Sequence, residues 1–81
     1  MNRNDMIKRW TKDASNLLVG KKIVAVRYLT DAERDGLFWH SASLAIQLDD
    51  GTLIWPSSDD EGNDAGALFT TSEKLDTIPV I

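Results

Sequence analysis

The chain has 81 residues, of which 42% are hydrophobic and 27% charged, with a formal net charge of −4 at pH 7. This length accommodates one domain over residues 1–81. Folding of such a domain buries only about 60 to 65% of the surface that the unfolded chain exposes. The absence of Cys excludes disulfides, thiolate metal sites and cysteine nucleophiles. Charged residues interrupt the N-terminal segment, so it lacks the apolar run of a signal peptide, and no apolar run is long enough for a membrane span. We therefore expect a small acidic protein of the cytoplasm.

Charge is distributed unevenly along the chain. Residues 1–27 contain seven basic and two acidic side chains, a net charge of +5, whereas residues 28–81 contain two basic and eleven acidic ones, a net charge of −9. The acidic majority repels phosphate and argues against a nucleic-acid binder. Two interpretations stay open: compensation between a basic helix and an acidic sheet within one chain, or attraction between copies or to an acidic partner.

The first predicted element is an amphipathic helix over residues 5–18. Its apolar positions fall within an arc of about 120° at 100° per residue, and charged residues take the opposite arc. Asn2 or Asn4 can cap the start, and Gly20 can adopt the left-handed conformation that ends a helix. We expect the apolar stripe to pack on the sheet that follows, not on a membrane surface. The stripe comprises Met6, Ile7, Trp10, Ala14, Leu17 and Leu18.

Residues 22–29 predict a strand in the interior of a sheet. The run is nearly continuous in apolar side chains and includes the β-branched Ile23 and Val24. Such a pattern is typical of a strand covered on both faces. Residues 30–36 follow as a solvated loop with room for one helical turn, because the segment has no apolar residue larger than Ala and ends in Gly.

A β-hairpin is the firmest tertiary prediction. Residues 41–49 alternate between apolar and polar side chains and lead into Asp50-Gly51, a sequence that favours a two-residue type I′ turn. Counting outward from that turn brings apolar residues of both strands onto the face that alternation assigns to the core. The predicted opposing pairs are Asp49 with Thr52, Leu48 with Leu53, Gln47 with Ile54, and Ile46 with Trp55.

The rest of the chain predicts short elements around a long loop. Pro56 cannot donate to a ladder and ends the second hairpin strand. A ten-residue polar loop over residues 57–66 leads to a short strand over residues 67–71, where capping-box spacing also predicts a helical turn near residues 70–73. Residues 77–81 predict an edge strand, because their proline can leave its missing donor facing solvent.

These elements together predict the α+β class. We expect an N-terminal amphipathic helix packed on a small, mainly antiparallel sheet of four to five strands. A small curled β-barrel with an N-terminal helix is the alternative.

Catalytic chemistry finds little support in the residues. His40 is the one histidine, and no serine lies in a nucleophile-elbow pattern beside a base. The paired carboxylates Asp49-Asp50 and Asp59-Asp60 fall on a turn and a polar loop, where hydration keeps both members ionised, whereas an acid/base pair needs one buried carboxyl. We expect no enzyme and no catalytic residue.

The acidic loop over residues 57–66 departs from regular ligand-binding loops. If Asp59 takes the first position of a calcium loop, Asp64 stands where Gly is required and Thr70 where Glu is required. Its glycines are not followed by the Lys of a phosphate-binding loop. We expect no cofactor and no dedicated metal site, and weak binding of a divalent ion stays open.

A binding surface is the interpretation that we favour. A polar loop of this length in a small domain is often functional, and it directly follows Trp55. We expect a non-enzymatic protein-interaction domain, homo-oligomeric, with an edge strand available for pairing across a two-fold axis. The alternative is a pocket that binds or sequesters a small polar molecule such as a nucleotide; the placement of Trp39 is open. The candidate binding residues are Trp39, His40, Trp55, Ser57, Ser58, Asp59, Asp60, Glu61, Asn63 and Asp64.

Overall fold

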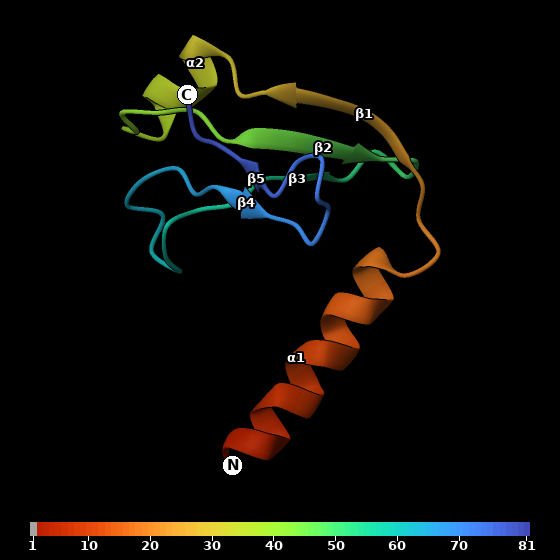
Figure 1. Cartoon of the computed structure of the whole chain (residues 1–81). Coiled ribbons are helices and arrows are strands. Elements are labelled where there is room, and N and C mark those ends of the chain that lie inside the picture. The colour runs from red at the N-terminus through yellow and green to blue at the C-terminus, as the bar shows by residue number, and fades with distance from the viewer. Residues whose placement is uncertain (1) are drawn as a thin grey trace.

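The computed structural model describes residues 2–81, and within them the chain forms two helices and five strands. In Figure 1 the strands gather into one body from which the first helix projects. The α+β class is confirmed, and the sheets are open, so the alternative of a curled barrel is wrong. In chain order the elements are α1 (Arg3–Leu18), β1 (Ile23–Tyr28), α2 (Asp31–Gly36), β2 (Leu44–Leu48), β3 (Leu53–Ile54), β4 (Leu68–Phe69) and β5 (Thr77–Ile78).

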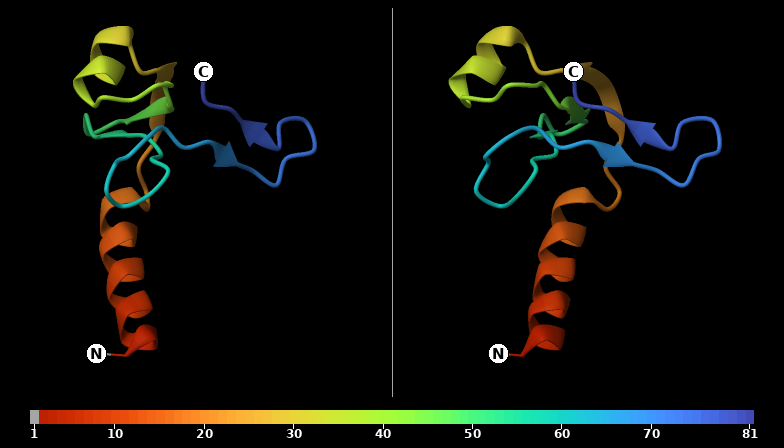
Figure 2. Two further views of the ribbon diagram at one scale, coloured as in Figure 1. Left: turned by 90° about the vertical axis from the view of Figure 1, so that its left-hand side faces the viewer. Right: turned by 60° about the vertical axis from the view of Figure 1, so that its left-hand side comes forward.

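The strands form two antiparallel sheets. The larger sheet has the order β1-β2-β3, and β4 pairs with β5 in a smaller one, which Figure 2 shows to one side of the larger sheet. The chain end is fastened to the larger unit, because the N–H of Ile81 donates to the carbonyl of Ala42 at 3.0 Å and the N–H of Ala42 donates back at 2.6 Å. The Tyr28 hydroxyl also donates to the carbonyl of Pro79 at 2.8 Å.

β1 lies at the edge of its sheet, and the prediction of an interior strand is wrong. Within residues 2–81, β2 is its one strand partner. The side chains from Ile23 to Arg27 are all exposed, and Val26 keeps 57% of its surface accessible. The β-branched run does favour strand conformation. Its apolar character indicates that both faces seek burial, but the rest of the chain does not supply that burial.

The β2–β3 hairpin forms in a register one residue away from the predicted one. Ile46 lies opposite Ile54, and Gln47 lies opposite Leu53. The two apolar residues of β3 therefore exchange faces relative to the prediction. Leu53 packs against the buried cluster, and Ile54 joins Ile46 on the other face of the sheet.

The register differs because the turn has three residues, not two. The N–H of Gly51 donates to the carbonyl of Leu48 at 3.0 Å, and the N–H of Leu48 donates to the carbonyl of Thr52 at 2.9 Å. Gly51 takes a φ of 91°, as the last residue of a three-residue hairpin loop with a bulge requires. The Asp50 carboxylate accepts the N–H of Thr52 at 2.9 Å and stabilises this turn.

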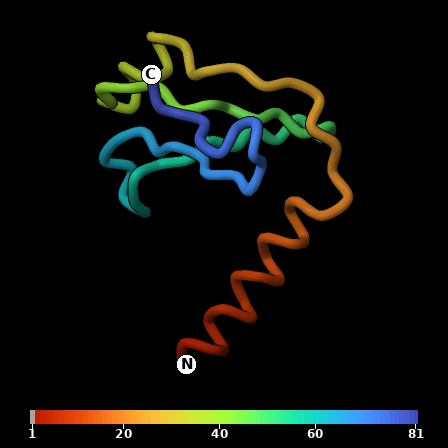
Figure 3. Tube along the Cα trace, viewed as in Figure 1, coloured from red at the N-terminus to blue at the C-terminus, as the bar shows by residue number. Residues whose placement is uncertain are grey.

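α1 forms as predicted but does not cover the sheet. The side chain of Asn2 caps it by accepting the N–H of Asp5 at 2.9 Å. No residue of α1 is buried, and Trp10 in the middle of the apolar stripe is 63% exposed. Figure 3 shows the helix running away from the strands. The expected packing of the stripe on the chain's own sheet is therefore not met, because the connection after α1 directs the helix outward.

The buried core is small and lies beside the long polar loop. Trp39, whose place is open from the sequence, is only 5% exposed and belongs to this core. With so few buried side chains, the monomer has little hydrophobic stabilisation. The cluster comprises Leu29, Trp39, Ala42 and Ala45, with Tyr28, Leu53 and Ala65 packed against it.

A capping box forms at the start of α2, not at the position predicted from the sequence. Thr30 Oγ1 accepts the N–H of Glu33 at 3.2 Å, and Glu33 Oε1 accepts the N–H of Thr30 at 2.8 Å, so α2 realises the helical turn allowed for residues 30–36. The helical turn predicted near residues 70–73 is absent from the structure, which has bends there. The Thr70 hydroxyl instead donates to the carbonyl of Leu75 inside the β4–β5 loop.

The two predicted C-terminal strands are present but shorter than predicted, as β4 and β5 of two residues each. Leu68 of β4 lies opposite Ile78 of β5, and Phe69 lies opposite Thr77.

Neither helix of residues 2–81 combines the length and the apolar character that crossing a membrane would require.

Candidate interaction surface

The polar loop over residues 57–66 is held closed by its own hydrogen bonds. Ser57 and Ala65 form an isolated antiparallel bridge. The N–H of Ser58 donates to the carbonyl of Asp64 at 2.9 Å, and the Asp64 carboxylate accepts the N–H of Ala65 at 2.8 Å. The backbone N–H of Ala65 is the main cause of the lowered pKa of Asp64.

Asp59 organises the tip of this loop. Its Oδ1 accepts the N–H of Glu61 at 2.9 Å and that of Asn63 at 3.2 Å, while Oδ2 accepts the side-chain amide of Asn63 at 2.7 Å. These donors, with the Asn63 side chain first, favour the charged carboxylate and hold the pKa of Asp59 below its ordinary value. The acceptor sites of Asp59 are therefore used by the loop itself.

The base of the loop is fixed to the start of β2 by Ser43. This fully buried side chain donates from Oγ to the carbonyl of Pro56 at 2.6 Å and accepts the N–H of Gly66 at 3.1 Å. Gly66 is close-packed, because a Cβ there would lie 2.8 Å from the backbone carbonyl of Ser57. Sequence reasoning missed Ser43, which the alternating pattern presents only as an ordinary polar strand residue.

The candidate residues divide into two groups in space. Trp39 reaches the loop through its indole Nε1, which donates to the carbonyl of Gly62 at 2.7 Å, and the backbone of His40 contributes to the lowered pKa of Asp64. Trp55 instead lines a groove and is 40% exposed. Seven candidates have exposed side chains on or beside the loop: His40, Ser57, Ser58, Asp59, Asp60, Glu61 and Asn63.

An apolar groove of about 170 Å³ lies beside Trp55. The groove lies between the two sheets, because its walls include residues of β2 and β3 from the larger sheet and of β4 from the smaller one. The lining includes no charged side chain, so it suits an apolar occupant better than a polar one. The lining residues are Ile46, Ile54, Trp55, Pro56 and Leu68.

A second feature is an exposed apolar surface on α1 and β1, which we term the uncovered surface. Apart from Val19, its residues are ones that the sequence predicts to be covered, on the stripe of α1 or on β1, and the structure leaves them exposed. Trp10 is covered only in part by the Arg9 guanidinium, which lies 5.9 Å from its ring centroid. The uncovered surface comprises Met6, Ile7, Trp10, Leu17, Leu18, Val19, Ile23, Val24 and Val26.

Part of the positive charge of residues 1–27 is compensated within the chain. Lys21 Nζ lies 2.7 Å from the Asp50 carboxylate, and this hydrogen bond lowers the pKa of Asp50 and raises that of Lys21. The contact ties the connection after α1 to the hairpin turn. Within residues 2–81, by contrast, Lys8, Arg9 and Lys12 of α1 form no ion pair.

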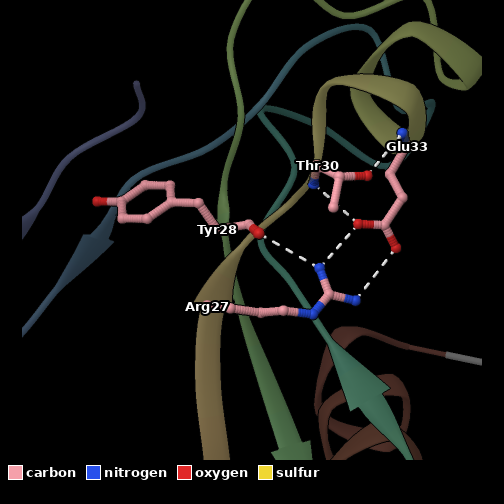
Figure 4. A network of polar contacts seen from close by, with 4 residues as sticks. All are labelled: Arg27, Tyr28, Thr30 and Glu33. Atoms are coloured by element: carbon pink, nitrogen blue, oxygen red, sulfur yellow. Dashed lines mark hydrogen bonds and ion pairs between the residues drawn. The ribbon is translucent and has the colours of Figure 1, made fainter.

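A second ion pair joins β1 to α2 (Figure 4). The Arg27 guanidinium donates to both oxygens of Glu33, at 2.7 and 3.2 Å, and also to the carbonyl of Tyr28 at 3.2 Å. These donors, with the Arg27 side chain first and the Thr30 N–H next, lower the pKa of Glu33 from 4.5 to about 2. The pair is exposed, so it fixes the geometry of α2 more than it adds stability.

Comparison with protein families, curated proteins and solved structures finds no match for this chain. Within the described residues, no group of three or more His, Cys, Asp or Glu side chains is arranged to hold a metal ion. The fold and the site define a small α+β domain with a closed polar loop, an apolar groove and an uncovered apolar helix.

Proposed function

We propose that this protein is a non-enzymatic interaction domain that associates with copies of itself. The supporting observation is its surface: the chain exposes 6356 Å². A compact monomer of 9.0 kDa is expected to expose about 4,900 Å², so the excess is about 1,500 Å². Because a standard protein interface buries about 800 Å² on each partner, the excess suffices for a stable interface.

The shape supports the same proposal. The radius of gyration is 14.3 Å, against about 12 Å for a compact domain of this length. The difference reflects α1, whose 16 residues span about 24 Å and lie apart from the sheet. Monomeric proteins rarely expose so many large apolar side chains on one helix and one strand, because such side chains drive association.

Charge favours a second copy of this chain as the partner. α1 and its connection belong to the segment of net charge +5, and the remaining residues carry −9. The opposite net charges of the two segments favour attraction between copies, and attraction of this kind guides encounter and orientation. The lack of Cys accords with a reducing compartment, and the proposal places the protein in the cytoplasm.

The alternative of a small polar ligand has less support. The groove is lined by apolar residues, and the hydrogen-bonding groups of Asp59 and Ser43 are engaged within the chain. An apolar side chain is the occupant that this lining favours.

Light scattering tests the proposal directly. The mass is measured at micromolar and at millimolar concentration. At the higher concentration we expect a mass of at least twice 9.0 kDa. A mass of one chain at both concentrations would overturn self-association.

A further inference from the structure

α1 is a helix that requires a partner surface. Isolated helices shorter than about 12 to 15 residues are marginal in water, and α1, with 16 residues and none of them buried, is only just longer. Most helical stability in proteins comes from packing of an apolar face. The stripe around Trp10 is such a face, and the rest of residues 2–81 leaves Trp10 63% exposed.

The larger sheet offers a matching apolar row. Residues directly opposite in neighbouring strands share a face, and the register aligns Val26 of β1 with Ile46 of β2 and Ile54 of β3. The row begins at the exposed Val26 and ends in the groove, where Leu68 of the smaller sheet forms another wall. It is thus one apolar path from the free edge of the sheet to the groove.

The size of the groove suits an aromatic anchor. Its volume is about 170 Å³, and a protein cavity of about 150 Å³ is known to hold a benzene ring. Aromatic side chains that fill pockets supply most of the energy in many interfaces, and Trp is enriched among them. Trp10 is the one aromatic side chain of α1 and is 63% exposed.

The connection after α1 holds the helix away from the groove of its own chain. Gly20 takes a φ of 81°, and the N–H of Lys21 donates to the carbonyl of Leu18 at 3.2 Å. The Lys21–Asp50 ion pair then fastens this connection to the hairpin turn. These contacts set the outward direction that Figure 1 shows.

We propose that α1 of a second copy occupies this apolar path, with Trp10 of that copy seated in the groove between Ile54 and Leu68. Because α1 and the groove are both present in each copy, a reciprocal exchange fills both grooves and closes a two-fold dimer. The inference rests on the proposed self-association and specifies the surface responsible for it.

Disulfide trapping tests the placement, because the natural chain has no Cys. One chain carries Ala14→Cys, one turn from Trp10 on the stripe of α1. A second chain carries Pro56→Cys, at the wall of the groove. The two chains are mixed and oxidised. We expect the mixed disulfide dimer, identified by its mass. The matched control, Asn16→Cys on the opposite face of α1, should yield at least about tenfold less of it.

Two results would overturn this placement. One is equal yield of mixed dimer from Ala14→Cys and Asn16→Cys. The other is closure of the disulfide within a single chain when Ala14→Cys and Pro56→Cys are combined in that chain, which would place α1 on its own groove.

Substitution of the anchor provides a second measurement. Trp10→Ala should raise the dimer dissociation constant at least about 30-fold, while Asn16→Ala changes it less than about threefold. Trp10 lies outside the core, so the sheet of the variant should stay folded. If the natural chain and Trp10→Ala dimerise equally well, self-association is retained but the proposed placement of α1 is wrong. If the natural chain is monomeric at every concentration, both proposals are wrong.

Discussion

The indole Nε1 of Trp39 donates to the carbonyl oxygen of Gly62 at 2.7 Å, a contact that joins the core to the polar loop. Trp39 comes from the segment after α2 and is buried, whereas Gly62 lies near the loop tip. One side chain thus supports the core through its ring and the loop through its single donor.

Trp39→Phe separates these two contributions. The ring keeps most of its apolar contact, but the carbonyl of Gly62 loses its donor, so we expect a loss of about 1 to 3 kcal/mol in the free energy of unfolding. Urea denaturation followed by circular dichroism measures it. An unchanged midpoint would mean that water replaces the indole without cost.

Gly66→Ala should destabilise the fold by about 1 to 3 kcal/mol. The new Cβ would lie 2.8 Å from the backbone of Ser57, so the base of the loop must shift and the Ser43 hydrogen bonds must lengthen. Gly36→Ala is the matched control, because a Cβ at Gly36 meets nothing within 4 Å. Thermal unfolding of both variants decides the point, and equal melting temperatures would contradict it.

Much of the secondary structure could be predicted from local signals in the sequence. The stripe and cap of α1, the alternation of β2 and the breaks at Pro56 and Gly51 depend on neighbouring residues, and each of those elements is present. The Asp50-Gly51 pair also fits two turns, since Gly with positive φ ends a three-residue loop as well as a two-residue one. The Asp50 bond to Thr52 favours the longer loop, and the register shifts accordingly.

Other features depend on contacts that a pattern does not contain. Periodicity shows which face of α1 seeks burial but not which surface covers it. The edge position of β1 follows from strand order, not from its own residues. The closure of the polar loop likewise depends on Ser43, which lies 13 residues before Pro56 in the chain.

Glu33 should make stability depend on acid pH. Its pKa is about 2 in the folded chain against an ordinary value of 4.5, so the folded state favours the carboxylate. The stabilisation is present above about pH 4.5 and is lost as the pH falls toward 2. Urea midpoints between pH 6 and pH 2 should therefore fall more steeply for the natural chain than for Glu33→Gln, which keeps a capping-box side chain. Parallel curves would show that the Arg27 contact does not persist in solution.

Phe38→Gly should stabilise α2. Phe38 follows the C-cap with a φ of 60°, and its side chain is 90% exposed. Its N–H donates to the carbonyl of Asp35, and the N–H of Trp39 donates to the carbonyl of Arg34. These bonds form a Schellman motif, in which Gly usually occupies the position of Phe38. Relief of about 1 to 2 kcal/mol of backbone strain exceeds the entropic cost of Gly, about 0.5 to 1 kcal/mol. Phe38→Ala retains the strain and serves as control. Equal melting temperatures for the two variants would contradict this account.

The helicity of the chain should depend on its concentration. If α1 is stabilised by a partner, dilution below the dissociation constant should remove most of its helical circular dichroism, because most helical stability comes from packing of an apolar face and no residue of α1 is buried within its own chain. The sheet should persist, since the buried cluster contains no residue of α1. Trp10→Ala should show the low helicity at concentrations where the natural chain is helical. Dissociation is followed by light scattering in the same dilution series, and constant helicity across it would contradict the stabilisation of α1 by a partner.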